Sequence, residues 1–266
     1  MILSEGPSDR AALTGFFTDL YSKIDENIEV FFPILSEESI NDEGDIETHY
    51  NGDITSRNGI NDSNILPMLL KLFIHPELKK HPAYEYPSSV CEVIHLVDID
   101  GVYLNDDRIQ TGEDQDMEHP YYDDKDNIII AKDRVALIDR NQRKRANLEK
   151  MINTKRLRIT MEKDANESRE KSYRVFFFSK DLDHVLYGRA NNESHYKVSD
   201  AQEFANSYYE DPLGMAKFFL EHPNASPFDN YLDSWKWLMD DTETLMPRTN
   251  LNVLVSDLLS RAGIKL

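Results

Sequence analysis

Acidic residues follow three apolar segments of this sequence, each at the point where the segment ends. They are Glu5 and Asp9 after residues 1–4, Asp98 and Asp100 after residues 90–97, and Asp181 and Asp183 after residues 173–178. Clustered carboxylates repel one another, and a hard cation that prefers oxygen ligands, such as Mg²⁺ or Mn²⁺, relieves that repulsion. Because Asp98 and Asp100 are separated by one residue, an extended chain would direct both carboxylates to the same side. The pattern therefore favours a divalent-metal site.

A parallel sheet would bring these acids together, because side chains at the carboxyl ends of its strands converge in one crevice. The first strand, helix and second strand would form a β-α-β unit, which indicates such a sheet. Ser8 is the expected N-cap of the first helix, and Gly188 the expected end of a helix that follows Asp183. The apolar pattern predicts strands at residues 1–4, 28–35, 90–97 and 173–178, and helices at residues 9–23, 65–80 and 140–153.

Two regions depart from this α/β pattern. Residues 36–64 are rich in Asp, Glu, Asn and Gly, which predicts an inserted, mobile polar loop with a hairpin turn at residues 51–52. From about Ser199 onward the sequence predicts three helices that cap the sheet, with Trp235 and Trp237 in their core or interface. We therefore expect an α/β domain over residues 1–190 and a helical C-terminal region over residues 191–266.

Composition limits the classes of function. The 266 residues include 40% hydrophobic residues, enough for a core, and carry a net charge of -19, which repels nucleic acid and anionic membranes unless a local basic patch overrides it. The single cysteine, Cys91, excludes an internal disulfide and fits a reducing compartment. Because the sequence has no window of 18 apolar residues and no signal-peptide pattern, we expect a cytoplasmic protein.

One segment is basic. Residues 132–163 contain eleven Lys or Arg residues against four acids, a net charge of +7. On a helix, Arg140, Arg143 and Lys144 lie on one face with Asn147, at spacings of three and four residues. This face, with Arg145 beside it, is predicted to contact a nucleic-acid backbone, and the alternative is a solvated charged helix face.

Two of the acidic motifs resemble those of the Toprim family. Residues 2–13, Ile-Leu-Ser-Glu-Gly-Pro-Ser-Asp-Arg-Ala-Ala-Leu, resemble the first Toprim motif as it occurs in the overcoming-lysogenization-defect nucleases and related defence proteins. Residues 96–100, Leu-Val-Asp-Ile-Asp, resemble the second motif, in which hydrophobic residues precede Asp-x-Asp. The resemblance follows residues 1–186 in outline and implies a Toprim-like α/β fold, a parallel sheet flanked by helices.

The resemblance also implies a function, that of a divalent-metal-dependent nuclease that hydrolyses DNA or RNA. Glu5, Asp98 and Asp100 would hold Mg²⁺ or Mn²⁺, and Asp9 and Asp183 would complete a second ion site. Asp183 stands where the family more often has Glu, and the sequence does not locate the lysine that serves the family as an accessory base. The chain itself has no G-x-x-x-x-G-K-[ST] motif. The resemblance to free-standing relatives implies a separate ATPase partner that gates cleavage, with phage defence as the setting.

Two alternatives remain open at this point. Residues 97–102 also resemble the first motif of haloacid dehalogenase phosphatases, which would make Asp98 a covalent nucleophile and Asp100 a general acid. Residues 175–179 would then be the second motif, and Asp240 and Asp241 a late acidic pair. Against this, a whole β-α-β unit is predicted before Asp98. The other alternative is a catalytically degenerate Toprim scaffold that acts as a binding subunit.

Overall fold

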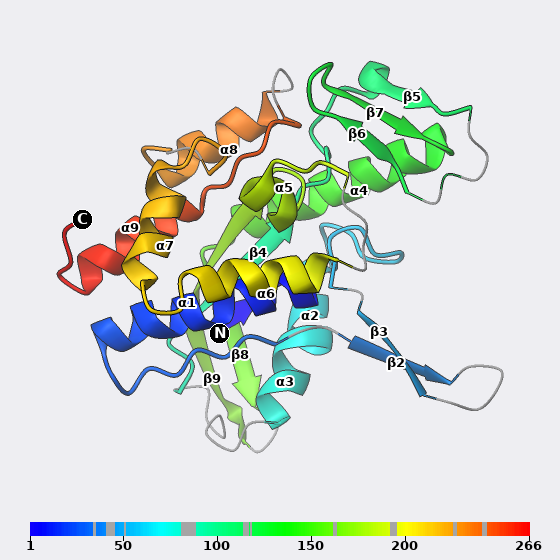
Figure 1. Ribbon diagram of the computed structural model, residues 1–266. Coiled ribbons are helices and arrows are strands. Elements are labelled where there is room, and N and C mark those ends of the chain that lie inside the picture. Colours follow the sequence, from blue (N-terminus) through cyan, green and yellow to red (C-terminus); the bar gives the residue numbers. More distant parts are fainter. Residues whose placement is uncertain are drawn as a thin grey trace.

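The computed structural model is α/β. Helices cover both faces of a central sheet, and further helices form the C-terminal part (Figure 1). None of the described helices is long and apolar enough to cross a membrane. The described residues are 1–33, 36–40, 46–50, 52–80, 89–113, 117, 119–161, 164–191, 196–225, 228–240 and 244–266.

The central sheet has the strand order β1-β4-β9-β8. Its first three strands are parallel, with Leu3 opposite His95 and Asp98 opposite Phe178, so their carboxyl ends lie at one edge. β8 runs antiparallel to β9. The strands are β1 (Ile2–Leu3), β4 (Glu92–Asp98), β9 (Asp164–Phe178) and β8 (Arg156–Met161). The strands expected at residues 1–4, 90–97 and 173–178 are confirmed, although β9 begins earlier.

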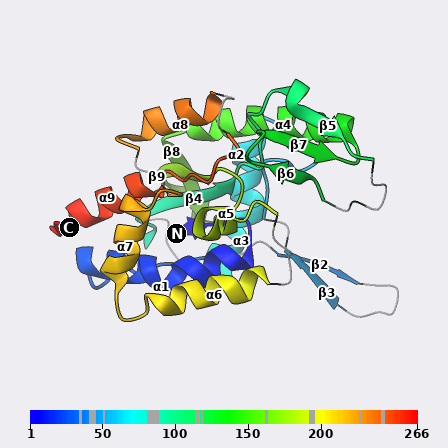
Figure 2. The ribbon, with the colours of Figure 1, turned by 45° about the horizontal axis from the view of Figure 1, so that its top comes forward.

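Strand alternation divides the apolar side chains between two cores. On β4, Ile94 and Leu96 belong to one core, whereas Val93 and Val97 belong to the other. The first core packs under α1 (Pro7–Ile24), α5 (Leu182–Tyr187), α6 (Lys197–Ser207), α7 (Pro212–Glu221) and α9 (Leu251–Arg261). The second packs under α2 (Ile65–Leu69), α3 (His75–Lys80), α4 (Arg134–Ile152) and α8 (Tyr231–Met239). Figure 2 shows the two helical layers with the sheet between them.

The acidic stretch after β4 folds into a second, smaller sheet with the order β5-β7-β6. β5 and β7 are parallel, whereas β6 and β7 are antiparallel. Ile109, Tyr122 and Ile129 from these strands pack with Leu137 of α4 in a separate small core. The strands are β5 (Ile109–Thr111), β6 (Tyr121–Asp123) and β7 (Ile128–Ala131).

Two predictions near the N-terminus are wrong. Residues 28–33 form no strand, although the Ile2 amide donates a hydrogen bond of 2.8 Å to the Phe31 carbonyl, and the parallel neighbour of β1 is β4 instead. Residues 34–35 lie outside the described residues. The N-cap of α1 is Gly6 rather than Ser8, because Pro7, which has no amide hydrogen to satisfy, takes the first helical position.

The inserted segment differs from the expected mobile loop. It contains an antiparallel hairpin, β2 (Ser36–Ile40) with β3 (Ile46–Tyr50), which projects from the body of the molecule (Figure 1). The turn expected at residues 51–52 is therefore misplaced, because β3 precedes it; residue 51 itself lies outside the described residues. The chain after the hairpin returns to the core, where Ile54, Thr55 and Ile60 are buried.

The predicted helices are largely confirmed. Residues 65–80 are helical throughout, with a π-helical segment, Leu70–Ile74, between α2 and α3. α4 begins at Arg134, six residues before the expected start, where the Asp133 side chain accepts a hydrogen bond from the Ala136 amide. α5 ends at Gly188 as expected, with φ of 66°. The described C-terminal part has four helices, α6 to α9, rather than three, and Trp235 is buried there.

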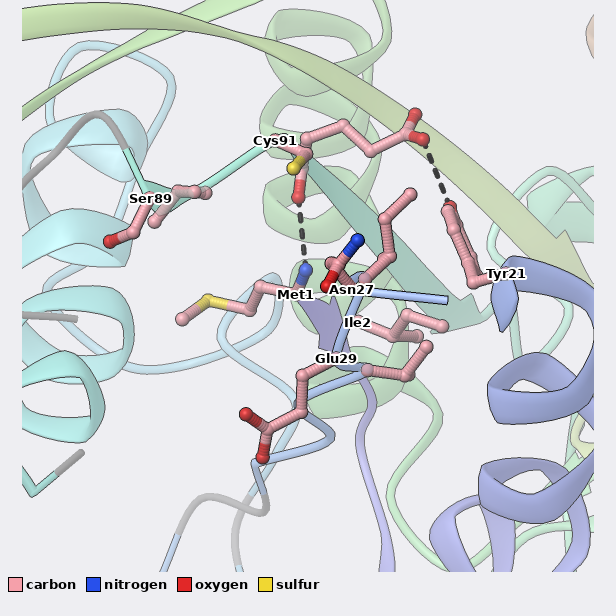
Figure 3. Close-up of a pocket in the computed structure, with 11 residues that line it drawn as sticks. Met1, Ile2, Tyr21, Asn27, Glu29, Ser89 and Cys91 are labelled. Carbon is pink, nitrogen blue, oxygen red and sulfur yellow. Dashed lines mark hydrogen bonds between the residues drawn. The ribbon is translucent and has the colours of Figure 1, made fainter. Parts of the chain in front are cut away.

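A buried ion network closes the amino edge of the sheet. The Glu92 carboxylate accepts hydrogen bonds from Tyr21 of α1 at 3.1 Å, Arg174 of β9 at 3.1 Å and Arg261 of α9 at 2.8 Å. Figure 3 shows the Tyr21 bond beside a cavity of about 220 Å³, where the Met1 ammonium donates to the Glu92 carbonyl. Glu92 thus joins the sheet to the helical layer that contains α1 and α9.

We expect Glu92→Gln to lower the free energy of unfolding at pH 7 by about 1–3 kcal/mol, because two arginines lose a buried anionic partner. Burial alone would raise the pKa of Glu92, but Arg261 and Arg174 hold it below the ordinary 4.5. Its contribution is therefore present above pH 4.5 and is lost as the pH falls through the lowered pKa. Urea denaturation at pH 7 and pH 3.5 measures this, with the exposed Glu26→Gln as control. An equal loss at both pH values would contradict the ionic account.

Candidate functional site

The carboxyl ends of β1, β4 and β9 meet at a cleft of about 380 Å³. Six acids and one lysine line it: Glu5, Asp9, Asp53, Asp98, Asp181, Asp183 and Lys197. The sheet therefore brings together four of the five predicted metal-binding acids, as the order of the strands implied. The fifth, Asp100, does not line the cleft but is linked to it through Lys144.

Asp98 and Asp100 have different surroundings. β4 ends at Asp98, and Asp100 has a left-handed φ of 53°, so the alternation of an extended strand does not reach it. Strand alternation therefore does not direct these two side chains to the same side, contrary to the prediction. Asp98 faces the cleft, whereas Oδ2 of Asp100 lies 3.2 Å from Nζ of Lys144.

Lys144 is the centre of a buried ion cluster. Its side chain is 0% exposed, and its Nζ lies 2.9 Å from Asp53 Oδ2, 3.2 Å from Asp100 Oδ2 and 3.9 Å from Glu5 Oε2. Burial alone would lower the pKa of this lysine, but the three carboxylates, led by Asp53, raise it above its ordinary value. Lys144 is therefore a charged ammonium group inside the protein.

Asp53 reaches this cluster from the inserted segment. Its Oδ1 accepts hydrogen bonds from the amides of Thr55 at 2.9 Å and Ser56 at 3.2 Å, and from the Thr55 hydroxyl. Burial would raise the pKa of Asp53, but Lys144 and these hydrogen bonds hold it well below its usual range. Gly52 is needed here, since a Cβ at this position would overlap the backbone of Glu5. The sequence analysis missed Asp53, whose only signal is a short Asp-x-Thr-Ser turn pattern.

Asp181 forms a second ion cluster at the other end of the cleft. Its Oδ2 lies 2.7 Å from Nζ of Lys180 and 2.8 Å from Nζ of Lys197, and its Oδ1 caps α5 at the His184 amide. Burial would raise its pKa, but the two lysines lower it to about 2. Asp181 is thus neutralised by the protein, whereas the buried Asp183 lines the cleft beside it.

Glu5 and Asp98 are less completely paired within the described part of the chain. One oxygen of Glu5, Oε1, and one of Asp98, Oδ1, are buried and have no hydrogen-bond partner among the described residues. Burial, with Asp53 next in importance, raises the pKa of Glu5 well above its ordinary value, and burial with Glu5 does the same for Asp98. Burial also raises the pKa of Asp9 to about 7, although the Gly6 amide donates to it at 3.1 Å.

These acids have the donor chemistry of a site for a hard divalent cation. Glu5 and Asp98 each have a buried oxygen without a partner among the described residues, and the neighbouring carboxylates repel one another; a cation would relieve both. Within the described part of the chain, however, no three His, Cys, Asp or Glu side chains already converge at metal-binding distance. The residues therefore fit Mg²⁺ or Mn²⁺ by chemistry, and binding requires their side chains to approach one another.

The basic helix α4 does not present the expected surface. Lys144 and Asn147 are buried, so the face that they share with Arg140 and Arg143 points into the molecule, and the prediction that it tracks a phosphate backbone is wrong for Lys144. The three arginines are half-buried. Their guanidinium groups donate to backbone carbonyls, Arg140 to Asp100, Arg143 to Ser56 and Arg145 to Val102.

Two further residues have settled places. Asp240, the late acid of the phosphatase alternative, lines a different cavity with Tyr103 and Arg145 rather than the cleft; Asp241 lies outside the described residues. His95 is buried, and its Nδ1 lies 3.0 Å from the Tyr173 hydroxyl. Burial lowers its pKa to about 4, which suits a neutral structural histidine.

Comparisons of the chain with protein-family models, with curated proteins and with solved structures found no match. In the site, Asp53 and Asp181 are closely paired with lysines, whereas Glu5 and Asp98 each keep a buried oxygen without a hydrogen-bond partner among the described residues.

We expect the metal-free protein to lose stability as the pH rises. An unfolded Asp9 titrates near 3.8, whereas the folded one has a pKa of about 7, so its favourable protonated state is present below pH 3.8 and is lost as the pH approaches 7. Asp9→Asn keeps a hydrogen-bond acceptor for Gly6 and should be more stable than the wild type at pH 8, by up to about 4 kcal/mol.

Thermal unfolding between pH 4 and 8, in buffer with a chelator, measures this difference. The exposed Asp62→Asn serves as control and should follow the wild-type pH dependence. If Asp9→Asn shows the wild-type dependence as well, Asp9 does not carry the proton that we assign to it.

Proposed function

We propose that this protein is a divalent-metal-dependent nuclease. The observation that carries the proposal is that Glu5 and Asp98, which follow or end adjacent parallel strands, line one cleft and each have a buried oxygen without a hydrogen-bond partner among the described residues. A phosphodiester is a polyanion, so carboxylates by themselves would repel it, and a cation between them reverses that effect.

Glu5 and Asp98 would hold the metal, with Asp9 and Asp183 beside them. When bound, a divalent cation polarises a phosphate oxygen and lowers the pKa of a bound water. The protein's own part is positioning: the Gly6 amide fixes Asp9, and the start of α5 fixes Asp183 in the cleft wall. Hydrolysis of a phosphodiester requires groups that are held in fixed positions around the reacting phosphate.

Two lysines, the buried Lys144 and the half-buried Lys197, have a separate role in this proposal. Lys197 and Lys144 both have a raised pKa, so both stay charged at neutral pH. A charged ammonium cannot accept a proton, which speaks against either lysine as a general base. It can stabilise negative charge that develops on the phosphate, and Lys197, which lines the cleft, is placed for this.

The resemblance to the Toprim family supports the same function. The order of the motifs along the chain, Glu5 first and Asp98-x-Asp100 second, corresponds to two neighbouring parallel strands with a common carboxyl edge. In keeping with that family, we propose DNA or RNA as the substrate, a separate ATPase as the partner that controls cleavage, and a cytoplasmic setting in phage defence. Arg140, Arg143 and Arg145 would provide further basic groups for the nucleic acid.

We expect Glu5→Gln and Asp98→Asn each to reduce Mg²⁺-dependent cleavage by about 1,000-fold or more, because several kcal/mol of charge stabilisation in the transition state is lost. Cleavage of labelled single-stranded and double-stranded DNA and RNA, with and without chelator, measures the effect, and Glu26→Gln is the control.

The same variants separate the alternatives. Full activity in Glu5→Gln would rule out the nuclease assignment. A phosphatase would need Asp98 as nucleophile and have no use for Glu5, so a phosphoaspartate trapped at Asp98 would decide for it. A wild-type protein that binds nucleic acid without cleaving it would favour the degenerate scaffold.

For nucleic-acid binding, we expect the double variant Arg143→Gln with Arg145→Gln to bind all sequences more weakly. Each phosphate contact that is lost should reduce the slope of log affinity against log salt by about one unit. Fluorescence anisotropy at several salt concentrations measures the slope. The matched control is Lys217→Gln with Lys236→Gln, two exposed lysines away from the cleft. An unchanged slope in the arginine variant would mean that the nucleic acid is held elsewhere.

A further inference from the structure

Lys144 lies where three parts of the chain that are distant in sequence place acids around one point. Glu5 follows β1, Asp53 comes from the inserted segment, and Asp100 follows β4. Their oxygens surround the ammonium at 3.9, 2.9 and 3.2 Å, respectively. Acids contributed by separate strands and loops around one cation are the usual arrangement of a protein metal site with oxygen ligands.

The Lys144 ammonium group forms hydrogen bonds with only part of this set of carboxylates. Its hydrogen bonds go to Asp53 and Asp100, while Glu5 Oε2 at 3.9 Å is beyond hydrogen-bond distance. The Glu5 side chain is only 9% exposed, and its other oxygen, Oε1, has no partner among the described residues. The three carboxylates, whose side chains are 9%, 20% and 24% exposed, face two positive charges: Lys144 and, 4.0 Å from Asp100 Oδ2, Arg140. Negative charge therefore exceeds positive charge by one, a deficit that a divalent ion in place of Lys144 would fill.

Asp53 is held in place independently of the lysine. Thr55 and Ser56 donate to its Oδ1, and the close approach of Gly52 to the Glu5 backbone fixes the segment against the cleft. The oxygen that faces Lys144 is therefore preorganised, and removal of the lysine would not release it. A carboxylate that is preorganised in this way can bind either the lysine or a metal ion in its place.

We propose that Lys144 is a built-in cation that occupies a divalent-cation position formed by Glu5, Asp53 and Asp100, and that Asp53 is the residue that positions it. The proposal deepens the proposed function, on which its account of catalysis rests. Glu5 belongs both to the carboxylates around Lys144 and to the acids of the cleft. Its Oε2 faces Lys144, and its Oε1 has no hydrogen-bond partner among the described residues. The acids of the cleft beyond Lys144, with Asp98 and Asp9 among them, then hold one divalent ion rather than two.

The test is the number of Mn²⁺ ions that the full-length chain binds, measured by isothermal titration calorimetry at pH 7.5. We expect a single ion per chain for the wild type and a second one for Lys144→Met, in which the three carboxylates lose their internal cation. Lys150→Met, an exposed lysine of the same helix, is the matched control and should bind as the wild type does.

Thermal unfolding gives a second readout. Lys144→Met should be less stable than the wild type without metal and should gain more from MnCl₂ than the wild type gains. Lys144→Gln, which keeps a hydrogen-bond donor near Asp53 and Asp100, provides a milder variant if the methionine variant does not fold in chelator. Variants that stay unfolded in MnCl₂ contradict the proposal, because the metal should take the place of the lysine.

The outcomes for the inference and for the proposed function are separate. If the wild type and Lys144→Met both bind a single ion with equal gain in stability, Lys144 does not occupy a cation position, while the metal-dependent function stands. If the wild type binds no Mn²⁺ and Lys144→Met binds one ion, the result supports the inference that Lys144 occupies a cation position and contradicts the metal-dependent function. A wild type that binds two ions contradicts the inference.

Discussion

Repulsion between buried carboxylates at the carboxyl edge of the sheet is the constraint on which the other features of this site depend. Three parallel strands necessarily deliver their following residues to one place, and here those residues are acids. A folded chain that buries such a cluster must supply positive charge, protonate some of the acids or bind a cation. The structure uses the first solution for Asp53 and Asp181, whereas the raised pKa values of Glu5, Asp9 and Asp98 show where the protein supplies too little positive charge.

The same sheet shows both treatments of a buried acid. At its amino edge Glu92 accepts hydrogen bonds from one tyrosine and two arginines, and these arginines lower its pKa. At its carboxyl edge Glu5 and Asp98 each keep an oxygen for which the described residues offer no hydrogen-bond partner. A fully paired acid stabilises the fold, whereas an unpaired one costs stability that a ligand can recover. This contrast is the physical reason for placing function at the carboxyl edge.

Much of the α/β framework could be predicted from the sequence. Apolar runs that end in acids, such as the one before Asp98, identify buried strands and their functional ends, because a continuous apolar strand needs cover on both faces. The convergence of Glu5, Asp9, Asp98 and Asp183 on one cleft follows from the common carboxyl edge of parallel strands. Residues 28–33 show the limit: their apolar composition suits a strand, but beside the edge strand β1 the hydrogen bond from Ile2 to Phe31 does not continue into a strand ladder.

What only the tertiary structure decided is which charges meet. The basic segment predicts a helix, and that helix forms, but its spacing cannot tell whether Lys144 faces solvent or the acids of another element. The polar composition of the inserted segment likewise suggests a solvated loop, although the half-buried Asp53 pairs with Lys144. Local sequence patterns indicate helices and candidate strands, whereas ion pairs such as Asp53 with Lys144, 91 residues apart, form only where packing brings distant segments together.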